Sequence, residues 1–111
     1  MLVSSSSATI ERLALPDNLT VRAAVDVRDL VLQALETHPA VELQIPEQAS
    51  IDLSFIQIAE AARLYSHKAS KSLSLSRPAD GALLAVLERG GIVDGMTPDD
   101  KQFWLHQGDT Q

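Results

Sequence analysis

The segment from Ser50 to Ala69, SIDLSFIQIAEAARLYSHKA, constrains the fold most strongly, because it joins a predicted strand end to the best-marked helix start in the chain. Ser54 and Gln57 have the capping-box spacing, in which the serine hydroxyl accepts a backbone amide hydrogen and the glutamine side chain reaches back to the serine backbone. Leu53 and Ile58 occupy the two positions of a hydrophobic staple. We therefore expect Ser54 to be the N-cap of the helix that follows.

Strands are predicted on both sides of this helix, which should run from about Phe55 to Lys68. Apolar and polar residues alternate over residues 41–45 and again over residues 72–76. This alternation has the period of a strand with one apolar face. Parallel strands that are covered on both faces usually read as continuous apolar runs, so the pattern indicates a sheet that carries its helices on one side and leaves a polar, open face.

Helical periodicity and turn residues predict the rest of the order. Beside the helix over 55–68, the expected elements are strands over 9–15 and 19–22, a helix from Ala24 to near His38-Pro39, strands over 41–45 and 73–75, a helix that starts at Pro78 and stops at Gly90-Gly91, a short edge strand at Ile92-Val93, and a helix capped by Thr97. We predict an α/β single domain with a mixed sheet and helices mainly on one face.

The predicted domain covers residues 8–96, after a flexible tail over residues 1–7. Residues 97–111 should form a C-terminal helical tail packed on the domain. This tail holds Phe103 and Trp104, two of the four aromatic residues in the chain. Two alternatives stay open for them: they complete the core, or they form a contact for a partner, since tryptophan is enriched in interface hot spots.

Composition excludes several classes of function. The chain has 111 residues, a formal charge of −6 and basic residues that are scattered singly, so we expect no nucleic-acid partner. No apolar run approaches the roughly 18 residues that a membrane span needs, and the first residues do not read as a secretory signal. The absence of cysteine fits a reducing compartment, so we expect a cytoplasmic protein.

No group of residues indicates catalysis or metal binding. His38, His67 and His106 lack a helical partner at the spacing of a metal site. The pair Gly90-Gly91 is followed by aliphatic residues and not by the Lys-Ser/Thr of a phosphate loop, and no serine lies in a Gly-x-Ser-x-Gly elbow. The sequence therefore predicts a protein that is not an enzyme and that has no metal site and no cofactor.

The order of elements, together with IDLSFIQIAEAARLYS, resembles the STAS domain of the bacterial anti-sigma-factor antagonists. The resemblance covers about Leu13 to Val93. In that family a strand ends in an Asp-Ser-Ser-Gly-like motif, and a kinase phosphorylates its second serine. The matching residues here are Asp52, Leu53, Ser54 and Phe55, so the acid and the acceptor serine are present, whereas leucine and phenylalanine replace the first serine and the glycine.

The resemblance implies a regulatory module that binds a protein partner, such as a serine kinase, an anti-sigma factor or a component of a signalling complex, and that is switched by phosphorylation of Ser54. A phosphate there would add about −1.5 to −2 charges, which a helix N-terminus tolerates, so its effect should fall on the interface. The expected partner-binding residues are Asp52, Leu53, Ser54, Phe55, Glu60, Arg63 and Ser66.

Two other functions remain open at this point. One is a constitutive STAS subunit that is not phosphorylated and holds together a transporter or chemosensory assembly; the phenylalanine in place of glycine favours it. The other is a sensor of small molecules or nucleotides, with its site at the strand ends, where ligands of α/β folds usually bind.

Overall fold

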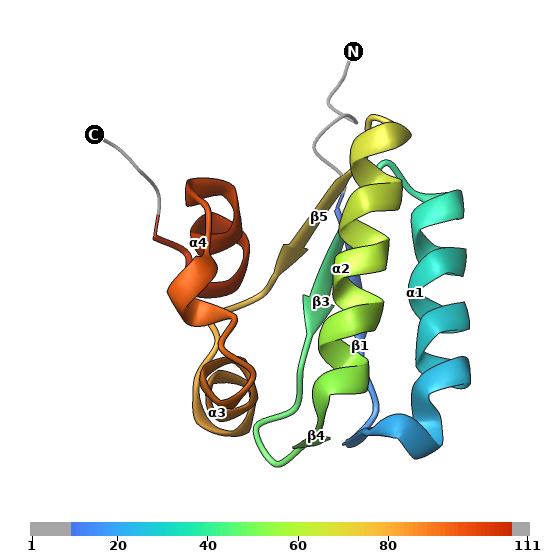
Figure 1. The fold of residues 1–111 in the computed structure, drawn as a ribbon. Coiled ribbons are helices and arrows are strands. Elements are labelled where there is room, and N and C mark those ends of the chain that lie inside the picture. The colour runs from blue at the N-terminus through green and yellow to red at the C-terminus, as the bar shows by residue number, and fades with distance from the viewer. Residues whose placement is uncertain (1–9, 108–111) are drawn as a thin grey trace.

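The computed structural model describes residues 10–107, which form one α/β unit (Figure 1). The strands are β1 (Glu11–Ala14), β2 (Asn18–Leu19), β3 (Ala40–Gln44), β4 (Ser50–Ile51) and β5 (Ser72–Leu75). The α-helices are α1 (Ala24–Thr37), α2 (Leu53–Lys68), α3 (Gly81–Arg89) and α4 (Pro98–Leu105), and two 3-10 turns, η2 (Val21–Ala23) and η3 (Val93–Gly95), precede α1 and α4. The predicted tail over residues 1–7 lies outside the described residues.

The sheet is parallel and not mixed. Strands β1, β3 and β5 lie side by side in that order, and β2 pairs with β4 in a separate two-stranded ladder. All three pairings found within residues 10–107 are parallel, with Leu13, Leu43 and Leu75 in register across the larger sheet. The prediction of a mixed sheet was wrong because the turn at residues 16–18 does not reverse the chain into a hairpin; it leads into β2, and helices make the long connections.

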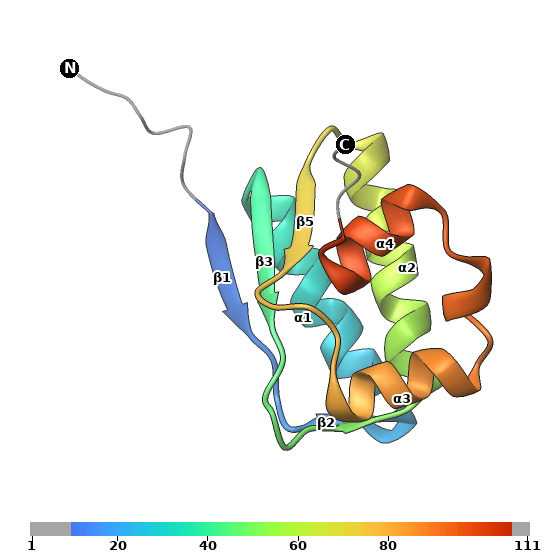
Figure 2. The same cartoon turned by 90° about the vertical axis from the view of Figure 1, so that its left-hand side faces the viewer.

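Helices α1 and α2 cover one face of the larger sheet, whereas α3 and α4 lie beyond its β5 edge (Figures 1 and 2). Figure 2 shows the other face of the sheet without a covering helix. Arg12, Glu42 and Ser74 lie in register there, and Arg12 Nε lies 3.2 Å from Glu42 Oε1. The predicted arrangement of helices on one face therefore holds for α1 and α2 and not for α3 and α4.

Several predicted element ends are confirmed. Helix α1 ends at Thr37, just before His38-Pro39. Helix α4 begins at the predicted cap, where Thr97 and Asp100 form a reciprocal capping box. Helix α3 ends at the predicted glycine pair: Gly91 has a φ of +72°, and the amides of Gly91 and Ile92 bond back to the carbonyls of Glu88 and Leu87 in a Schellman motif.

Three predicted elements differ from the structure. The edge strand at Ile92-Val93 was wrong: the amides of Gly95 and Met96 bond back to the carbonyls of Ile92 and Val93, which forms η3. The strand over 19–22 is only β2, because η2 begins at Val21. Helix α3 begins at Gly81 and not at Pro78, because the backbone of Asp80 is extended, with φ −150° and ψ 178°.

The core joins both groups of helices. Buried residues from α1, α2, α3, α4 and the sheet form one hydrophobic cluster. Trp104 is its largest fully buried side chain, and Phe103 is 7% exposed. Their ring centroids lie 4.8 Å apart in an edge-to-face arrangement, which is favourable for aromatic pairs. The C-terminal helix therefore completes the core of the domain.

Candidate functional site

The turn before α2 is organised by Asp52, which is the N-cap of the helix. Its backbone is extended, and its Oδ1 accepts hydrogen bonds from the amide of Ser54 at 2.9 Å and from the Ser54 hydroxyl. Its Oδ2 accepts from the amide of Val21 in η2, also at 2.9 Å. One carboxylate thus caps α2 and joins it to the segment before α1.

The prediction that Ser54 caps α2 was wrong. Ser54 lies inside the first turn and donates its hydroxyl hydrogen to Asp52, while the helix starts two residues earlier than expected, at Leu53. The predicted capping box with Gln57 and the predicted staple between Leu53 and Ile58 are also wrong, because both assumed that Ser54 is the N-cap. A carboxylate has two acceptor oxygens and can bond two amides at once, which explains why Asp52 is preferred over a single hydroxyl.

The hydrogen bonds lower the pKa of the Asp52 carboxyl below its ordinary value of 3.8. The Ser54 hydroxyl contributes most, and the amides of Val21 and Ser54 add to it, against an opposing effect of burial. Asp52 is therefore ionised at neutral pH. A negative charge at this position also interacts favourably with the N-terminal end of the α2 dipole.

Leu53 and Phe55, which flank Ser54, lie in opposite environments. Leu53 is 47% exposed, and a Cβ placed on Gly90 would lie 3.3 Å from its Cδ2, so Leu53 lies over the end of α3. Phe55 is 1% exposed and belongs to the core cluster. Its expected place in a partner-binding surface is contradicted, because the ring points into the core on the first turn of α2.

The other expected partner-binding residues lie further along α2 and contact α4. Arg63, whose side chain is 14% exposed, contacts the carboxylates of Glu60, Asp99 and Asp100 at 2.9 to 3.2 Å. Its guanidinium also lies 4.7 Å from the centre of the Phe103 ring. These contacts hold α4 against α2.

Two more contacts complete this polar cluster. Glu60 accepts a hydrogen bond from Trp104 Nε1 at 3.0 Å, so the one polar atom of the buried indole is paired. Ser66 is 5% exposed and donates its hydroxyl hydrogen to the carbonyl of Arg63. Only a small part of Ser66 is therefore exposed, where it lines the groove between α2, β5 and α4. We call Glu60, Arg63, Asp99, Asp100 and Trp104 the α2–α4 cluster.

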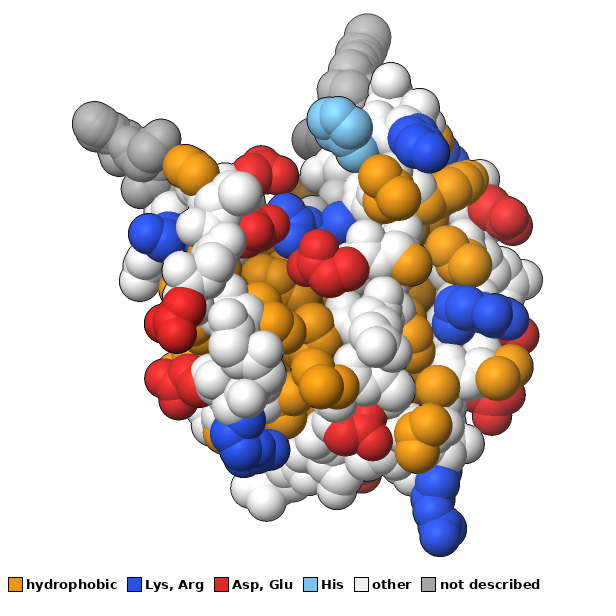
Figure 3. All heavy atoms as spheres, viewed as in Figure 1, with side chains coloured by type: hydrophobic (Ala, Val, Ile, Leu, Met, Phe, Trp, Pro, Cys, Tyr) orange, Lys and Arg blue, Asp and Glu red, His pale blue; other side chains and the backbone are white. Residues whose placement is uncertain are grey.

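The structure therefore divides the predicted partner-binding residues. Asp52, Leu53 and Ser54 form the turn, whereas Glu60, Arg63 and Ser66 line a groove between α2, β5 and α4 with a volume of about 540 Å³. Figure 3 shows acidic and basic side chains gathered between α4 and the upper half of α2, and hydrophobic side chains in the hollow below them. Position Ser66 is about 18 Å from Ser54 along the helix axis.

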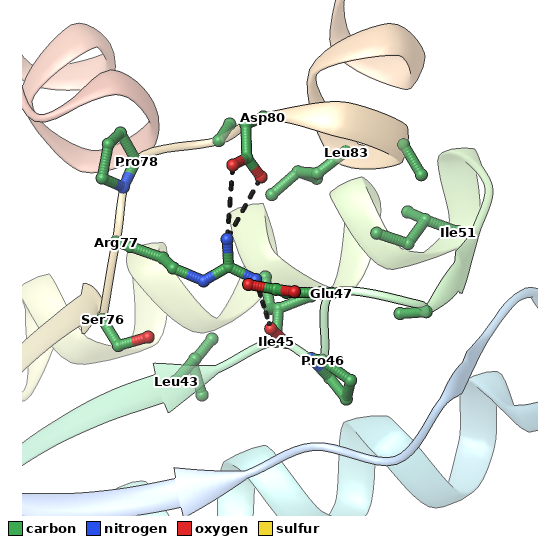
Figure 4. Close-up of a pocket in the computed structure, with 13 residues that line it drawn as sticks. Leu43, Ile45, Pro46, Glu47, Ile51, Ser76, Arg77, Pro78, Asp80 and Leu83 are labelled. Atoms are coloured by element: carbon green, nitrogen blue, oxygen red, sulfur yellow. Dashed lines mark hydrogen bonds and ion pairs between the residues drawn. The ribbon is translucent and has the colours of Figure 1, made fainter.

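A second cavity lies at the carboxyl ends of β3 and β5, where the sensor alternative places a ligand (Figure 4). Arg77 extends across it, donating to both carboxylate oxygens of Asp80 at 3.3 Å and to the carbonyl of Ile45 at 3.1 Å. The cavity volume is about 20 Å³, which is space for about one water molecule. A nucleotide does not fit there without a rearrangement of Arg77.

Sequence reasoning missed the contacts that cross between distant segments. Val21 was assigned to a strand, but its amide hydrogen binds Asp52. Asp99 and Asp100 were explained by helix capping alone, although both also bind Arg63. One signal was available: in Asp-x-Ser before a helix, the aspartate is as good an N-cap as the serine.

Comparisons with protein families, curated proteins and solved structures found no match. Within residues 10–107, no helix is long and apolar enough to cross a membrane. The same part of the chain contains no group of three or more histidine, aspartate or glutamate side chains that could hold a metal ion.

Proposed function

We propose that the chain is a regulatory protein-binding module of the anti-sigma-factor-antagonist type, and that the turn Asp52–Ser54 is its docking surface. The observation that carries this proposal is the exposure of Leu53 beside a fixed carboxylate. Val21 and Val25 are also 69% and 62% exposed, and Val21 is bonded to Asp52. Exposed apolar side chains grouped beside polar ones are typical of protein interaction sites.

Phosphorylation of Ser54 would act on this surface through Asp52. The Ser54 hydroxyl donates to Asp52 Oδ1, so a phosphate on Ser54 would place a second anion against the carboxylate. The two anions would repel each other, and Asp52 would lose the hydrogen bond from the Ser54 hydroxyl. We expect the modification to alter the turn and to release a partner that binds it.

The same hydrogen bond favours a second candidate, a constitutive subunit of a transporter or chemosensory assembly. In the unmodified protein the Ser54 hydroxyl is already occupied by Asp52, and repulsion from Asp52 opposes the addition of a phosphate. In that case the exposed turn would bind a permanent partner, and Ser54 would serve only to hold Asp52 in place.

Two matched variants of α2 test the docking surface. Leu53→Asp and Ala61→Asp each place one negative charge at an exposed apolar residue of the same helix, and Ala61 does not line the groove between α2, β5 and α4. Proteins captured from source cells by the wild type should be lost with Leu53→Asp and retained with Ala61→Asp. The proposal is wrong if no captured protein depends on Leu53.

A second pair of variants separates the switched and the constitutive forms. Ser54→Ala should keep the partner that depends on Leu53, whereas Ser54→Asp should release it. Incubation with that partner and ATP, followed by mapping of phosphate by mass spectrometry, should then find Ser54 modified. Retention of the partner by both variants, together with an unmodified Ser54, would identify the constitutive subunit.

A further inference from the structure

The exposed leucine at the start of α2 packs on the end of α3. A Cβ placed on Gly90 would lie 3.3 Å from Leu53 Cδ2 and 3.4 Å from Ile92 Cδ1, so these two side chains meet over the glycine. Helix α3 lies at the same end of the molecule as the start of α2 (Figures 1 and 2). Leu53 therefore has close neighbours in a distant segment, although its side chain is 47% exposed.

Close packing, and not backbone conformation, explains the glycine at position 90. Gly90 has a φ of −81° and a ψ of 0°, which residues with side chains also adopt. Gly91 differs, because its φ of +72° favours glycine. A Cβ on Gly90 would be closer to Leu53 than the 3.4–4 Å of ordinary contact, and the third near atom, the Val86 carbonyl oxygen, belongs to the last turn of α3 itself. The missing Cβ thus leaves the space that the Leu53 side chain fills.

The position of the Leu53 side chain matters for binding. A side chain that is already held in one conformation loses less entropy when a partner binds it. Gly90 determines where the Leu53 side chain lies, and the proposed docking surface depends on Leu53. Gly90 is itself exposed and Ile92 is half-buried, so a partner that contacts Leu53 can also contact both of them.

We propose that Gly90 is a positioning residue of the docking surface, which extends from the turn at residues 52–54 to residues 90–92. This inference rests on the proposed function, since it assigns a second segment to the same site. The protein partner presents an apolar side chain that packs on Leu53 and Ile92 together. The absence of a side chain at Gly90 allows these two residues to meet, and neither segment forms the contact alone.

The contact can be tested in the free protein by NMR of its leucine methyl groups. Gly90→Ala should shift the methyl signals of Leu53 and give a nuclear Overhauser effect between Leu53 and the new methyl group. Gly95→Ala is the matched control, because Gly95 has no positive φ and a Cβ on it would meet nothing within 4 Å. The control should leave the Leu53 signals unchanged. Unchanged Leu53 signals in Gly90→Ala overturn the proposal.

The effect on binding is measured with a protein whose capture depends on Leu53, purified and titrated against each variant. Gly90→Ala should weaken its binding about fivefold, the low end of the cost of repacking an apolar contact. Gly95→Ala should leave its binding unchanged. If no captured protein depends on Leu53, the proposed function itself is wrong. If such a protein binds Gly90→Ala as tightly as the wild type, only the role of Gly90 is wrong.

A double-mutant cycle shows whether Gly90 acts through Leu53. Methionine has no branch at Cγ, so Leu53→Met removes the Cδ2 methyl group that lies nearest to position 90. In this background Gly90→Ala should weaken binding by less than about twofold, because the two positions no longer interact. Equal weakening in both backgrounds would show that Gly90 acts without Leu53, which contradicts a positioning role.

Discussion

Helix α2 contacts its neighbours in two different ways along its length. Its N-terminal turn is held by one carboxylate, that of Asp52, which bonds two segments and leaves Leu53 exposed. Its C-terminal half is held by the α2–α4 cluster, in which Arg63 is 14% exposed and the indole of Trp104 is buried. Both regions are charged, but the first depends on a single carboxylate at the surface, whereas the second packs against the core and keeps α4 in place.

The largest effect should follow the loss of the Arg63 charge. In Arg63→Met the carboxylates of Glu60, Asp99 and Asp100 lose their shared cation, and we expect the free energy of unfolding to fall by roughly 2–3 kcal/mol, less than for a fully buried pair. Urea denaturation measures the change. Arg28→Met is the control, because within residues 10–107 Arg28 pairs only with the exposed Asp29 and should change stability by less than about 0.5 kcal/mol. Equal effects would show that the cluster is a surface feature.

The N-terminal turn should respond less, and mainly to Asp52. Asp52→Ala removes the N-cap and the bond to Val21, and should cost roughly 1–2 kcal/mol. Ser54→Ala should cost about 0.5–1 kcal/mol, less than Asp52→Ala, because Asp52 still accepts the amide hydrogens of Ser54 and Val21. Thermal unfolding of the two variants measures the difference. A cost for Ser54→Ala equal to that for Asp52→Ala would return the capping role to Ser54.

How far the sequence predicts each region depends on the range of its contacts. The cap of α4 was predicted because Thr97, Pro98 and Asp100 interact with one another over one helical turn. The start of α2 offered two local solutions, Asp52 and Ser54, and the chosen one also binds an amide 31 residues away. The residues around Asp52 could not predict its hydrogen bond to the Val21 amide, because η2 and α2 come together only in the folded chain.

The same reasoning explains the α2–α4 cluster. The separation between Glu60 and Trp104 is 44 residues, and that between Arg63 and Asp99 is 36. Sequence periodicity placed Glu60 and Arg63 on α2 but could not show that α4 covers them. The order of the four α-helices and the face of the sheet that α1 and α2 cover were predictable, because they follow from periodicity over whole segments.

Acid should affect both regions in the same direction. The pKa of Asp52 is lowered chiefly by the Ser54 hydroxyl, and the pKa of Asp100 chiefly by the amide of Thr97. A carboxyl whose pKa is lower in the folded state than in the unfolded state stabilises the fold when the pH is above the pKa of the unfolded state. This contribution disappears as the pH falls through the pKa of the folded state. The melting temperature, measured from pH 7 to pH 2, should therefore decrease once the pH is lower than about 4.

Asp52→Asn separates the two contributions to this profile. The variant should be less stable than the wild type at pH 7, and the difference should shrink as the pH falls and the wild-type carboxyl becomes protonated. A difference that stays constant down to pH 2 would show that the charge of Asp52 contributes nothing to the turn.

The smallest change should stabilise the C-terminal end of α2 alone. Ser70 has a φ of 58°, and its amide and that of Lys71 bond back to His67 and Ser66 in the same Schellman arrangement that ends α3, where Gly91 has the positive φ. Glycine adopts this conformation without strain, so Ser70→Gly should raise the free energy of unfolding by about 0.5 kcal/mol, the strain relief being partly offset by chain entropy. Gly91→Ser should lower it, and urea denaturation of the pair gives both signs. A loss of stability in Ser70→Gly would mean that the serine side chain contributes more to stability than its backbone strain costs. If Leu53→Asp abolishes partner capture equally with and without Ser70→Gly, the two ends of α2 act independently.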